Sequence, residues 1–290
     1  MKLVLVLSAL VAVSAAYIVE QDQNTAFNYM ERFGVPEAER IRKAEEEYFS
    51  SRITGGAPAN LGQFPYQAGL ISDIQGISGQ GVCGGSLLSA NRVITAAHCW
   101  FDGVNRAWRF TVVLGSVTLF AGGVRVQSTD VVMHSSWTPS LVRNDIAMIR
   151  LPVQLAFTNN IQPIALPTGS EVNEAFTGVT AVASGFGMLG NNININNNQF
   201  LSHVSLQVIS NNVCWLSFPL IVQSSNICTS GAGGTSPCRG DSGGPLALTR
   251  SGRTILLGIT SFGSPQGCES GNPAAFVRVT SYLDFIQANL

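Results

Sequence analysis

The chain has 290 residues, with 16 basic and 17 acidic side chains and a formal net charge of −1. This balance lacks the basic excess that a nucleic-acid partner requires, and no uninterrupted apolar stretch is long enough to span a membrane. We therefore expect neither a nucleic-acid partner nor membrane insertion.

The first 16 residues have the pattern of a secretory signal peptide. Lys2 precedes a short apolar run that ends in the small residues Val-Ser-Ala-Ala, and such a run is followed by signal cleavage. Cleavage after Ala15 and cleavage after Ala16 both fit, and a buried terminal strand or helix is the alternative. The pattern predicts a secreted protein.

Residues 17–52 differ in composition from the rest, with eight acidic and five basic side chains. Pro36 can open a helix over Glu37 to Tyr48, in which Glu39 and Lys43 have the spacing of a helical ion pair. Few apolar residues are available for a core, so we expect a short surface helix. The segment has no cysteine, so no disulfide would hold it to the remainder after a cut.

The remaining 238 residues, from Ile53 onward, show many short apolar runs between turn-forming residues. This pattern is typical of an all-β sandwich or barrel. Only Tyr282 to Leu290 has helical character, with Thr280 or Ser281 as a candidate cap. The runs that we expect to be strands are Phe64–Leu70, Ser86–Thr95, Phe110–Leu114, Val124–Val132, Ala147–Leu151, Val179–Gly185, Leu201–Ile209, Pro245–Leu248, Thr254–Ser261 and Ala275–Val279.

Three short motifs together indicate nucleophilic catalysis. Ser242 lies in Gly-Asp-Ser-Gly-Gly-Pro, His98 in Thr-Ala-Ala-His-Cys, and Asp145 in Asn-Asp-Ile-Ala. A serine hydroxyl attacks a carbonyl efficiently only when a base removes its proton, and an acid can orient that base. Each motif alone could be a turn or a buried structural residue; their coincidence favours a catalytic triad.

In this order the motifs resemble those of the chymotrypsin-like serine proteases, with a character closest to insect digestive chymotrypsins, and the resemblance runs from Ile53 to Leu290. It implies two six-stranded antiparallel β-barrels packed together with a short C-terminal helix, and a boundary between the barrels near residues 163–167. It also implies a secreted serine endopeptidase that works through an acyl-enzyme, with protein or peptide substrates.

The junction between Arg52 and Ile53 resembles a zymogen activation site, which makes residues 17–52 an activation propeptide. A trypsin-like protease would cut after Arg52, and the new ammonium group of Ile53 would pair with Asp241, since a buried charge needs a partner. A plain polar linker is the alternative. The resemblance also implies an oxyanion hole formed by the backbone N–H groups of Gly240 and Ser242.

Six cysteines in a secreted chain predict disulfides, and fifteen pairings are open from the sequence alone. A metal site is disfavoured because no Cys-x-x-Cys pair occurs, and residues 115–126, where the family can hold calcium, contain no acidic side chain. We expect no metal and no cofactor. The resemblance implies the pairs Cys83–Cys99, Cys214–Cys228 and Cys238–Cys268.

The resemblance also aligns a neutral substrate pocket with Ser236 at its base and Gly263 and Ala274 as its walls. It implies a preference for large apolar or aromatic residues, with a preference for leucine or an elastase-like preference as the alternative. The other residues that it places near the substrate are Phe262, Arg239 and Ser261, the last beside Asp145.

The domain from Ile53 has ten arginines and no lysine. Arginine stays charged at a pH where lysine loses its proton, which suggests alkaline surroundings such as an insect gut lumen; drift in base composition is the alternative. We expect a digestive monomer, with protein protease inhibitors as further candidate partners. The rival interpretations are a non-catalytic binding homologue and a regulatory cascade protease.

Overall fold

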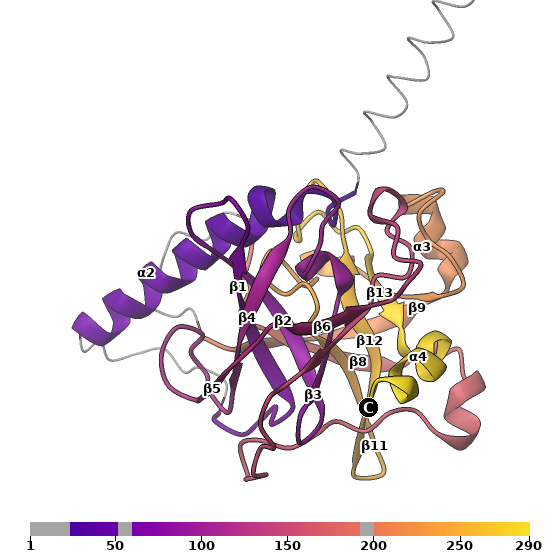
Figure 1. Cartoon of the computed structure of the whole chain (residues 1–290). Helices are drawn as coiled ribbons and strands as arrows, with labels where there is room; N and C mark the ends of the chain where they lie inside the picture. Colours follow the sequence, from indigo (N-terminus) through magenta and orange to yellow (C-terminus); the bar gives the residue numbers. More distant parts are fainter. Residues whose placement is uncertain (1–23, 52–59, 192–199) are drawn as a thin grey trace, which may run out of the picture.

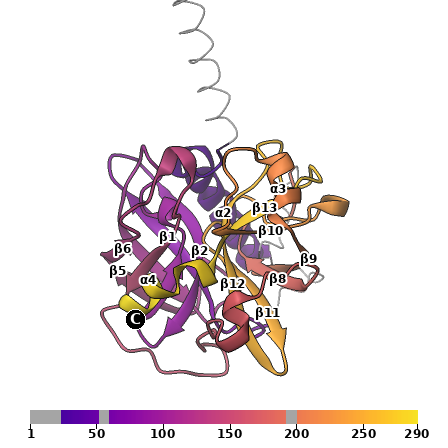
Figure 2. The same ribbon diagram turned by 90° about the vertical axis from the view of Figure 1, so that its right-hand side faces the viewer.

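In the computed structural model, residues 24–51, 60–191 and 200–290 are described, and the signal-peptide prediction, Arg52 and Ile53 lie outside them. Two β-sheet lobes stand side by side, the first purple to magenta and the second orange to yellow (Figures 1 and 2). No helix among the described residues is long and apolar enough to cross a membrane.

The first lobe is a seven-stranded antiparallel sheet with the order β5-β4-β1-β2-β3-β7-β6. The expected strand over Val124–Val132 is interrupted at Thr129, so that two strands form and pair with different neighbours. The prediction of a six-stranded barrel is therefore wrong for this lobe. Its strands are β1 (Gln67–Ile74), β2 (Gln80–Ser89), β3 (Arg92–Thr95), β4 (Ala107–Leu114), β5 (Val124–Ser128), β6 (Asp130–Met133) and β7 (Ala147–Arg150).

The second lobe is a closed six-stranded barrel, as predicted, with the order β10-β13-β12-β11-β8-β9. Its core contains Leu206, Ile227, Leu246, Leu257 and Phe276, all of which are buried. The strands are β8 (Thr180–Gly185), β9 (Ser202–Ile209), β10 (Asn226–Thr229), β11 (Pro245–Arg250), β12 (Arg253–Phe262) and β13 (Ala274–Arg278).

The chain passes between the lobes within the connection from β7 to β8. The N–H of Ile164 still donates to Leu87 of β2, at 2.9 Å, whereas the N–H of Ala165 donates to Thr254 of β12, at 3.2 Å. The crossing therefore lies between these two residues.

Helices are few in the described chain, and most of them are single turns. The C-terminal helix α4 (Leu283–Ala288) follows the 3₁₀ turn η6 (Val279–Tyr282), and Ile286 packs into the core of the first lobe. Neither Thr280 nor Ser281 caps α4, because its N-cap position is Tyr282. The remaining short helices are η2 (Ala97–Cys99), η3 (Pro139–Leu141), η4 (Gly169–Asn173), α3 (Asn211–Ser217) and η5 (Ala232–Gly234).

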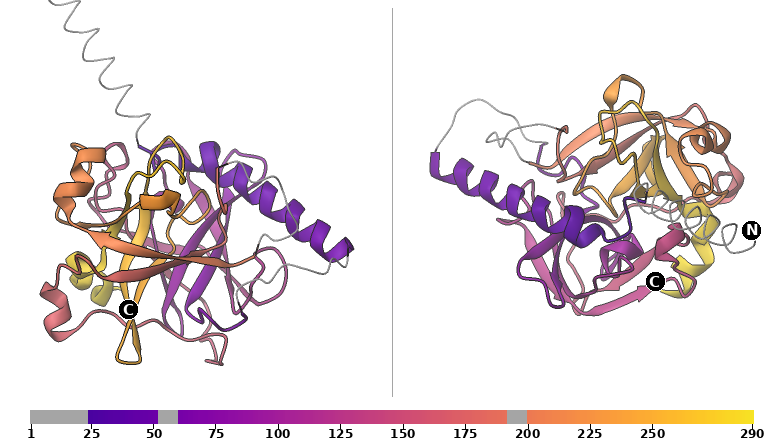
Figure 3. Two further views of the ribbon diagram at one scale, coloured as in Figure 1. Left: turned by 180° about the vertical axis from the view of Figure 1, so that it is seen from behind. Right: turned by 90° about the horizontal axis from the view of Figure 1, so that it is seen from above.

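The segment that precedes Arg52 forms a π-helical turn, η1 (Met30–Gly34), followed by the helix α2 (Val35–Ser51). The helix is longer than the predicted Glu37 to Tyr48, and it packs against the molecule instead of lying free on its surface. Ala38 and Ile41 are fully buried in a cluster with residues of both lobes. Seen from above, the N-terminal end of α2 lies near the centre of the molecule and its C-terminal end projects outward (Figure 3).

The six cysteines form three disulfides, Cys83–Cys99, Cys214–Cys228 and Cys238–Cys268. These are the pairs that the resemblance implied.

Candidate active site

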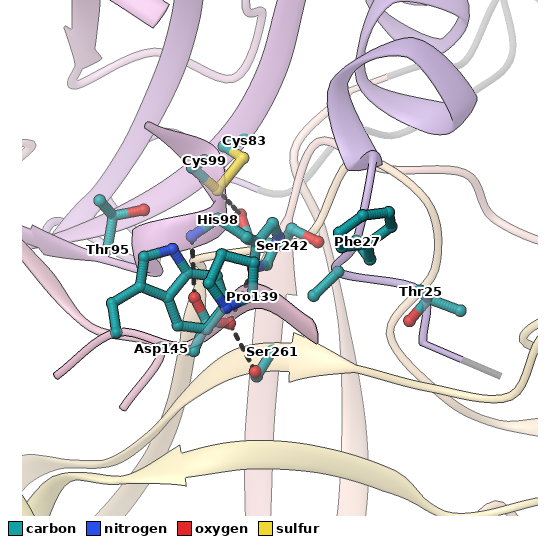
Figure 4. A network of polar contacts seen from close by, with 12 residues as sticks. Thr25, Phe27, Cys83, Thr95, His98, Cys99, Pro139, Asp145, Ser242 and Ser261 are labelled. Atoms are coloured by element: carbon teal, nitrogen blue, oxygen red, sulfur yellow. Dashed lines mark hydrogen bonds and ion pairs between the residues drawn. A yellow bond between two sulfur atoms is a disulfide. The ribbon is translucent and has the colours of Figure 1, made fainter. Parts of the chain in front are cut away.

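The three motifs of the predicted triad meet between the two lobes (Figure 4). His98 lies in η2, directly after β3, and Asp145 lies two residues before β7; because β3 and β7 pair in register from Thr95 and Ala147, the two side chains are neighbours. Ser242 lies in the turn before β11 of the second lobe. Both lobes thus contribute to one site.

Asp145 holds the imidazole of His98 in place. Its Oδ2 lies 2.7 Å from Nδ1 of His98, and its Oδ1 accepts the backbone N–H of the same residue at 2.8 Å. The hydroxyl of Ser261 in β12 also donates to Oδ2, at 2.6 Å. With Nδ1–H donated to the carboxylate, Nε2 carries the lone pair, which is the tautomer a general base requires.

The turn that carries Ser242 is fixed from both lobes. The carbonyl of Ser242 accepts the N–H of Gly84 in β2 at 2.7 Å, and the N–H of Gly243 donates to Thr260 in β12 at 2.8 Å. Gly243 has a φ of +82°, and a Cβ there would lie 2.2 Å from the hydroxyl of Thr95. Only glycine fits this position, so the serine is presented on a rigid turn.

In the uncleaved chain the hydroxyl of Ser242 is not bonded to His98. Tyr29, from the segment before Arg52, lies in the pocket beside Ser242, and its ring meets the imidazole of His98 edge-on. Nε2 of His98 is buried and has no hydrogen-bond partner among the described residues.

The carboxyl group of Asp241 is buried behind the serine. Its two oxygens accept the backbone N–H groups of Gly187 at 2.8 Å and Cys238 at 2.9 Å. Burial raises the pKa of Asp241 to about 6, and the nearby carboxylate of Glu37 adds to the rise, whereas the two hydrogen bonds and the charge of Arg40 lower it.

A pocket beside Ser242 brings together the residues that the sequence placed near the substrate. It is lined by Ser236, Ala274, Gly263, Ser261 and Phe262, with Arg239 among the other lining residues. A Cβ at Gly263 would meet nothing within 4 Å, so the wall is open there. Ser236 and Ala274 are neutral, so Arg239 is the one charged side chain among the described residues that line the pocket.

Thr25, Tyr29 and Phe33 also line this pocket, and the sequence analysis did not anticipate them. The available signal was the spacing of Met30, Gly34, Ala38 and Ile41, which places small and apolar residues on one side of a helix. The many charges of the segment obscured that pattern.

A cluster of Cys83, His98 and Cys99 has the composition of a metal site. Because both cysteines are in a disulfide with each other, neither sulfur is a thiolate that could bind a metal. The cluster is therefore part of the fold around the histidine.

Comparisons with known proteins agree with this geometry. The family model described as Trypsin matches residues 53–286. A collagenase of Hypoderma lineatum is 41% identical over 84% of this chain and 89% of its own length, and brachyurin of Leptuca pugilator is 39% identical over 81% and 97%. Serine protease 1 of Drosophila melanogaster is 38% identical over 82% and 85%.

The fold is also similar to a solved structure. The structure of HL collagenase superposes with a TM-score of 0.72 at 41% identity, covering 82% of this chain and 98% of that one. The order of the motifs, the meeting of both lobes at the serine and these relatives lead to one conclusion. The chain belongs to the trypsin family and is a chymotrypsin-like serine endopeptidase.

Proposed function

We propose that His98, Asp145 and Ser242 hydrolyse peptide bonds through an acyl-enzyme once the segment before Ile53 has been cut and has left the site. The main supporting observation is the carboxylate of Asp145, whose Oδ2 lies 2.7 Å from Nδ1 of His98 and 2.6 Å from the hydroxyl of Ser261. A buried carboxylate in this position stabilises the imidazolium that forms when the histidine takes a proton.

In the first half of the reaction, His98 removes the proton of the Ser242 hydroxyl as its oxygen attacks the carbonyl carbon. The negative charge on the carbonyl oxygen is then stabilised by the N–H groups of Gly240 and Ser242. The C–N bond breaks as His98 gives the proton to the leaving amine. Water repeats the sequence on the ester and releases the acid, and Ser242 recovers its proton.

The neutral pocket favours large apolar or aromatic side chains before the cut bond. Ser236 provides no carboxylate for a basic side chain, and the open wall at Gly263 leaves room for a ring. The methyl of Ala274 shortens the pocket slightly, so leucine-preferring or elastase-like specificity is the alternative.

The protein is made, on this proposal, as a secreted zymogen. A trypsin-like protease cuts after Arg52, and the ammonium group of Ile53 replaces backbone groups as the partner of Asp241. Digestion in the gut lumen fits the lysine-free domain, and the partners would be dietary proteins and protein protease inhibitors of a monomeric enzyme. A non-catalytic binding role is less well supported because all three triad side chains are present.

The test is to cut the secreted chain with trypsin, inhibit the trypsin with an inhibitor directed at basic residues, and compare peptides with Phe, Leu, Ala or Arg before the cut bond. We expect the highest kcat/KM for Phe, and no activity from an Arg52→Gln chain. Collagen belongs in the panel, because one relative is named a collagenase. A preference for Arg, or equal rates with Ser242→Ala, would contradict the proposal.

A further inference from the structure

The chain before Arg52 crosses the active site from one lobe to the other. The side-chain amide of Asn24 donates to the carbonyl of Pro139 in the first lobe at 2.8 Å, and the hydroxyl of Thr25 accepts the N–H of Gly263 in the second lobe at 3.1 Å. Ala26 is fully buried beyond them. Thr25 and Phe27 are both drawn near Ser242 in Figure 4. This end of the segment therefore occupies substrate-side surface of both lobes.

Tyr29 covers the catalytic groups themselves. Its ring meets the imidazole of His98 edge-on, with 4.8 Å between the centroids. Its hydroxyl donates to the carbonyl of Val82 at 3.0 Å, and the side chain lines the same pocket as Ser242. The side chain of Tyr29 thus fills the space beside His98 and Ser242 that a substrate would enter.

The segment presents no peptide bond for cleavage at this point. The backbone turns at Asn28, which has a φ of +52°, and coils into η1, so it is not an extended strand that could pair with a sheet edge. Because the part of the segment that lies beside His98 and Ser242 is the side chain of Tyr29, it offers the serine oxygen no carbonyl carbon to attack. The segment can therefore occupy the site without being cut there.

The turn η1 and the helix α2 anchor this arrangement on the rest of the protein. Phe33 lies under the guanidinium of Arg239, 4.9 Å from the ring centroid. Ala38 and Ile41 pack with Val82 and Phe186. The buried carboxylate of Glu45 accepts the N–H groups of Leu119 and, at 2.9 Å, Phe120.

We propose that residues 24–51 are a non-covalent inhibitor of the protease, with Tyr29 as the group that occupies the catalytic centre, and that they remain bound after the chain is cut at Arg52. Activation then has two steps, cleavage and release. This inference rests on the proposed function of the same site. It follows because every contact described above involves residues before Arg52 and residues after Ala59, so the cut breaks none of them.

The experiment separates cleavage from release. Residues 48–52 are replaced with Asp-Asp-Asp-Asp-Lys, so that enteropeptidase cuts once and leaves Ile53 as the new terminus. The cut protein is divided: one part is assayed at once at micromolar concentration, and the other is passed through a gel-filtration column. We expect the prosegment to elute with the domain, and the undiluted sample to have less than about a tenth of the activity that is reached on dilution.

The variants assign the effect to Tyr29. Tyr29→Ala should give the full rate directly after cleavage, and the released prosegment that carries it should inhibit the enzyme roughly 30-fold less strongly. Tyr29→Phe keeps the ring, and its prosegment should inhibit more strongly than the Tyr29→Ala prosegment and less strongly than the unaltered one. If the Tyr29→Ala chain does not fold, Tyr29→Phe provides the test. Glu46→Ala, at an exposed position of the same helix, should behave as the unaltered chain.

Full activity at the moment of cleavage, with the prosegment eluting separately, would overturn this inference and leave the proposed function intact. If instead the domain stays inactive after complete removal of the prosegment, and an organophosphate fails to label Ser242, the proposed function itself fails. Co-elution without any inhibition would also contradict the role of Tyr29.

Discussion

At the scale of single residues, the site depends on how its two buried carboxylates are satisfied. Asp145 accepts three hydrogen bonds, from the side chain and backbone of His98 and from Ser261. Asp241 accepts two, both from backbone N–H groups. Since hydrogen bonds to charged groups contribute about twice as much as neutral ones, removal of a single donor should be measurable.

Ser261→Ala removes one donor from Asp145 and leaves Ser236, the predicted base of the substrate pocket, unchanged. We expect kcat/KM of the activated enzyme to fall roughly tenfold, since a hydrogen bond to a charged group is worth about 1.5–3 kcal/mol and part of that is lost in the transition state. Steady-state kinetics on the best peptide would measure it. Ser205→Ala, on the exposed face of β9, is the control, and equal rates for both variants would contradict the role of Ser261.

The pKa of Asp241, about 6 in the uncleaved chain, has a consequence for stability. A carboxyl group whose pKa is higher in the folded state than in the unfolded state stabilises the fold when protonated. Its contribution is complete below the ordinary pKa near 3.8 and is lost as the pH rises through 6. At roughly 1.4 kcal/mol per pKa unit, the loss is about 3 kcal/mol.

We therefore expect the Asp241→Asn precursor to lose less stability between pH 4 and pH 7 than the unaltered precursor. Urea unfolding at several pH values would measure how the free energy of unfolding of each precursor changes with pH. Comparing these slopes removes the pH-independent cost of replacing the carboxylate with an amide, which is a weaker acceptor. Parallel curves for the two chains would show that Asp241 is already ionised at pH 4.

At the scale of elements, the sequence predicted what local patterns determine. The three site motifs, five of the six strands of the second lobe and the helical character after Pro36 could be read directly, whereas β10 was not expected. The division of a strand at Thr129 could not, because the two halves differ only in their neighbours, β4 and β7. The docking of α2 was missed because Glu37 and Glu45 are charged in sequence but buried in the fold, where Arg40 and backbone N–H groups satisfy them.

The docking of α2 and Tyr29 should weaken as the pH rises. Burial raises the pKa values of Glu37, Glu45 and Tyr29, and for Tyr29 the charges of Glu37 and Asp241 add to the rise, although the polar groups of Ser242 and Gly240 lower it. When the pKa of a group is higher in the docked prosegment than in the free one, docking weakens at any pH where the group is ionised in the free prosegment.

The inhibition constant of the released prosegment should therefore increase with pH. Above about pH 10, where a free tyrosine ionises, it should rise roughly tenfold per pH unit. Tyr29→Phe should abolish this upper increase and keep the lower one from Glu37 and Glu45. Titration of the activated enzyme with each prosegment, from pH 5 to pH 11, measures both; an inhibition constant that falls with pH would contradict the assignment.

At the scale of the whole molecule, the two lobes are unequal: one is a closed barrel and the other an open seven-stranded sheet. The prosegment lies where they meet and contacts both. The domain from Ile53 onward has arginine but no lysine. Its ion pairs, such as Arg253 with Glu171 at 2.8 Å, therefore persist at a pH where a lysine would lose its charge.

We expect the activated enzyme to keep most of its activity from pH 8 to about pH 10.5, because arginine stays protonated there whereas lysine does not. Rates and residual activity after incubation across this range would test it. A variant in which the arginines of exposed pairs are replaced by lysine, Arg150→Lys and Arg250→Lys, is the matched comparison and should lose activity earlier. A collapse of the parent enzyme above about pH 9 would contradict the alkaline adaptation.

The pocket around Asp241 has one more consequence, for chemical labelling. With no lysine after residue 52, the activated domain would carry a single primary amine, at its new terminus. An acylating reagent such as acetic anhydride then reports on one atom: a terminus enclosed beside this carboxylate is protected, and an exposed one gains a single acetyl group. Intact-mass measurement could follow the insertion of that terminus with no substrate present.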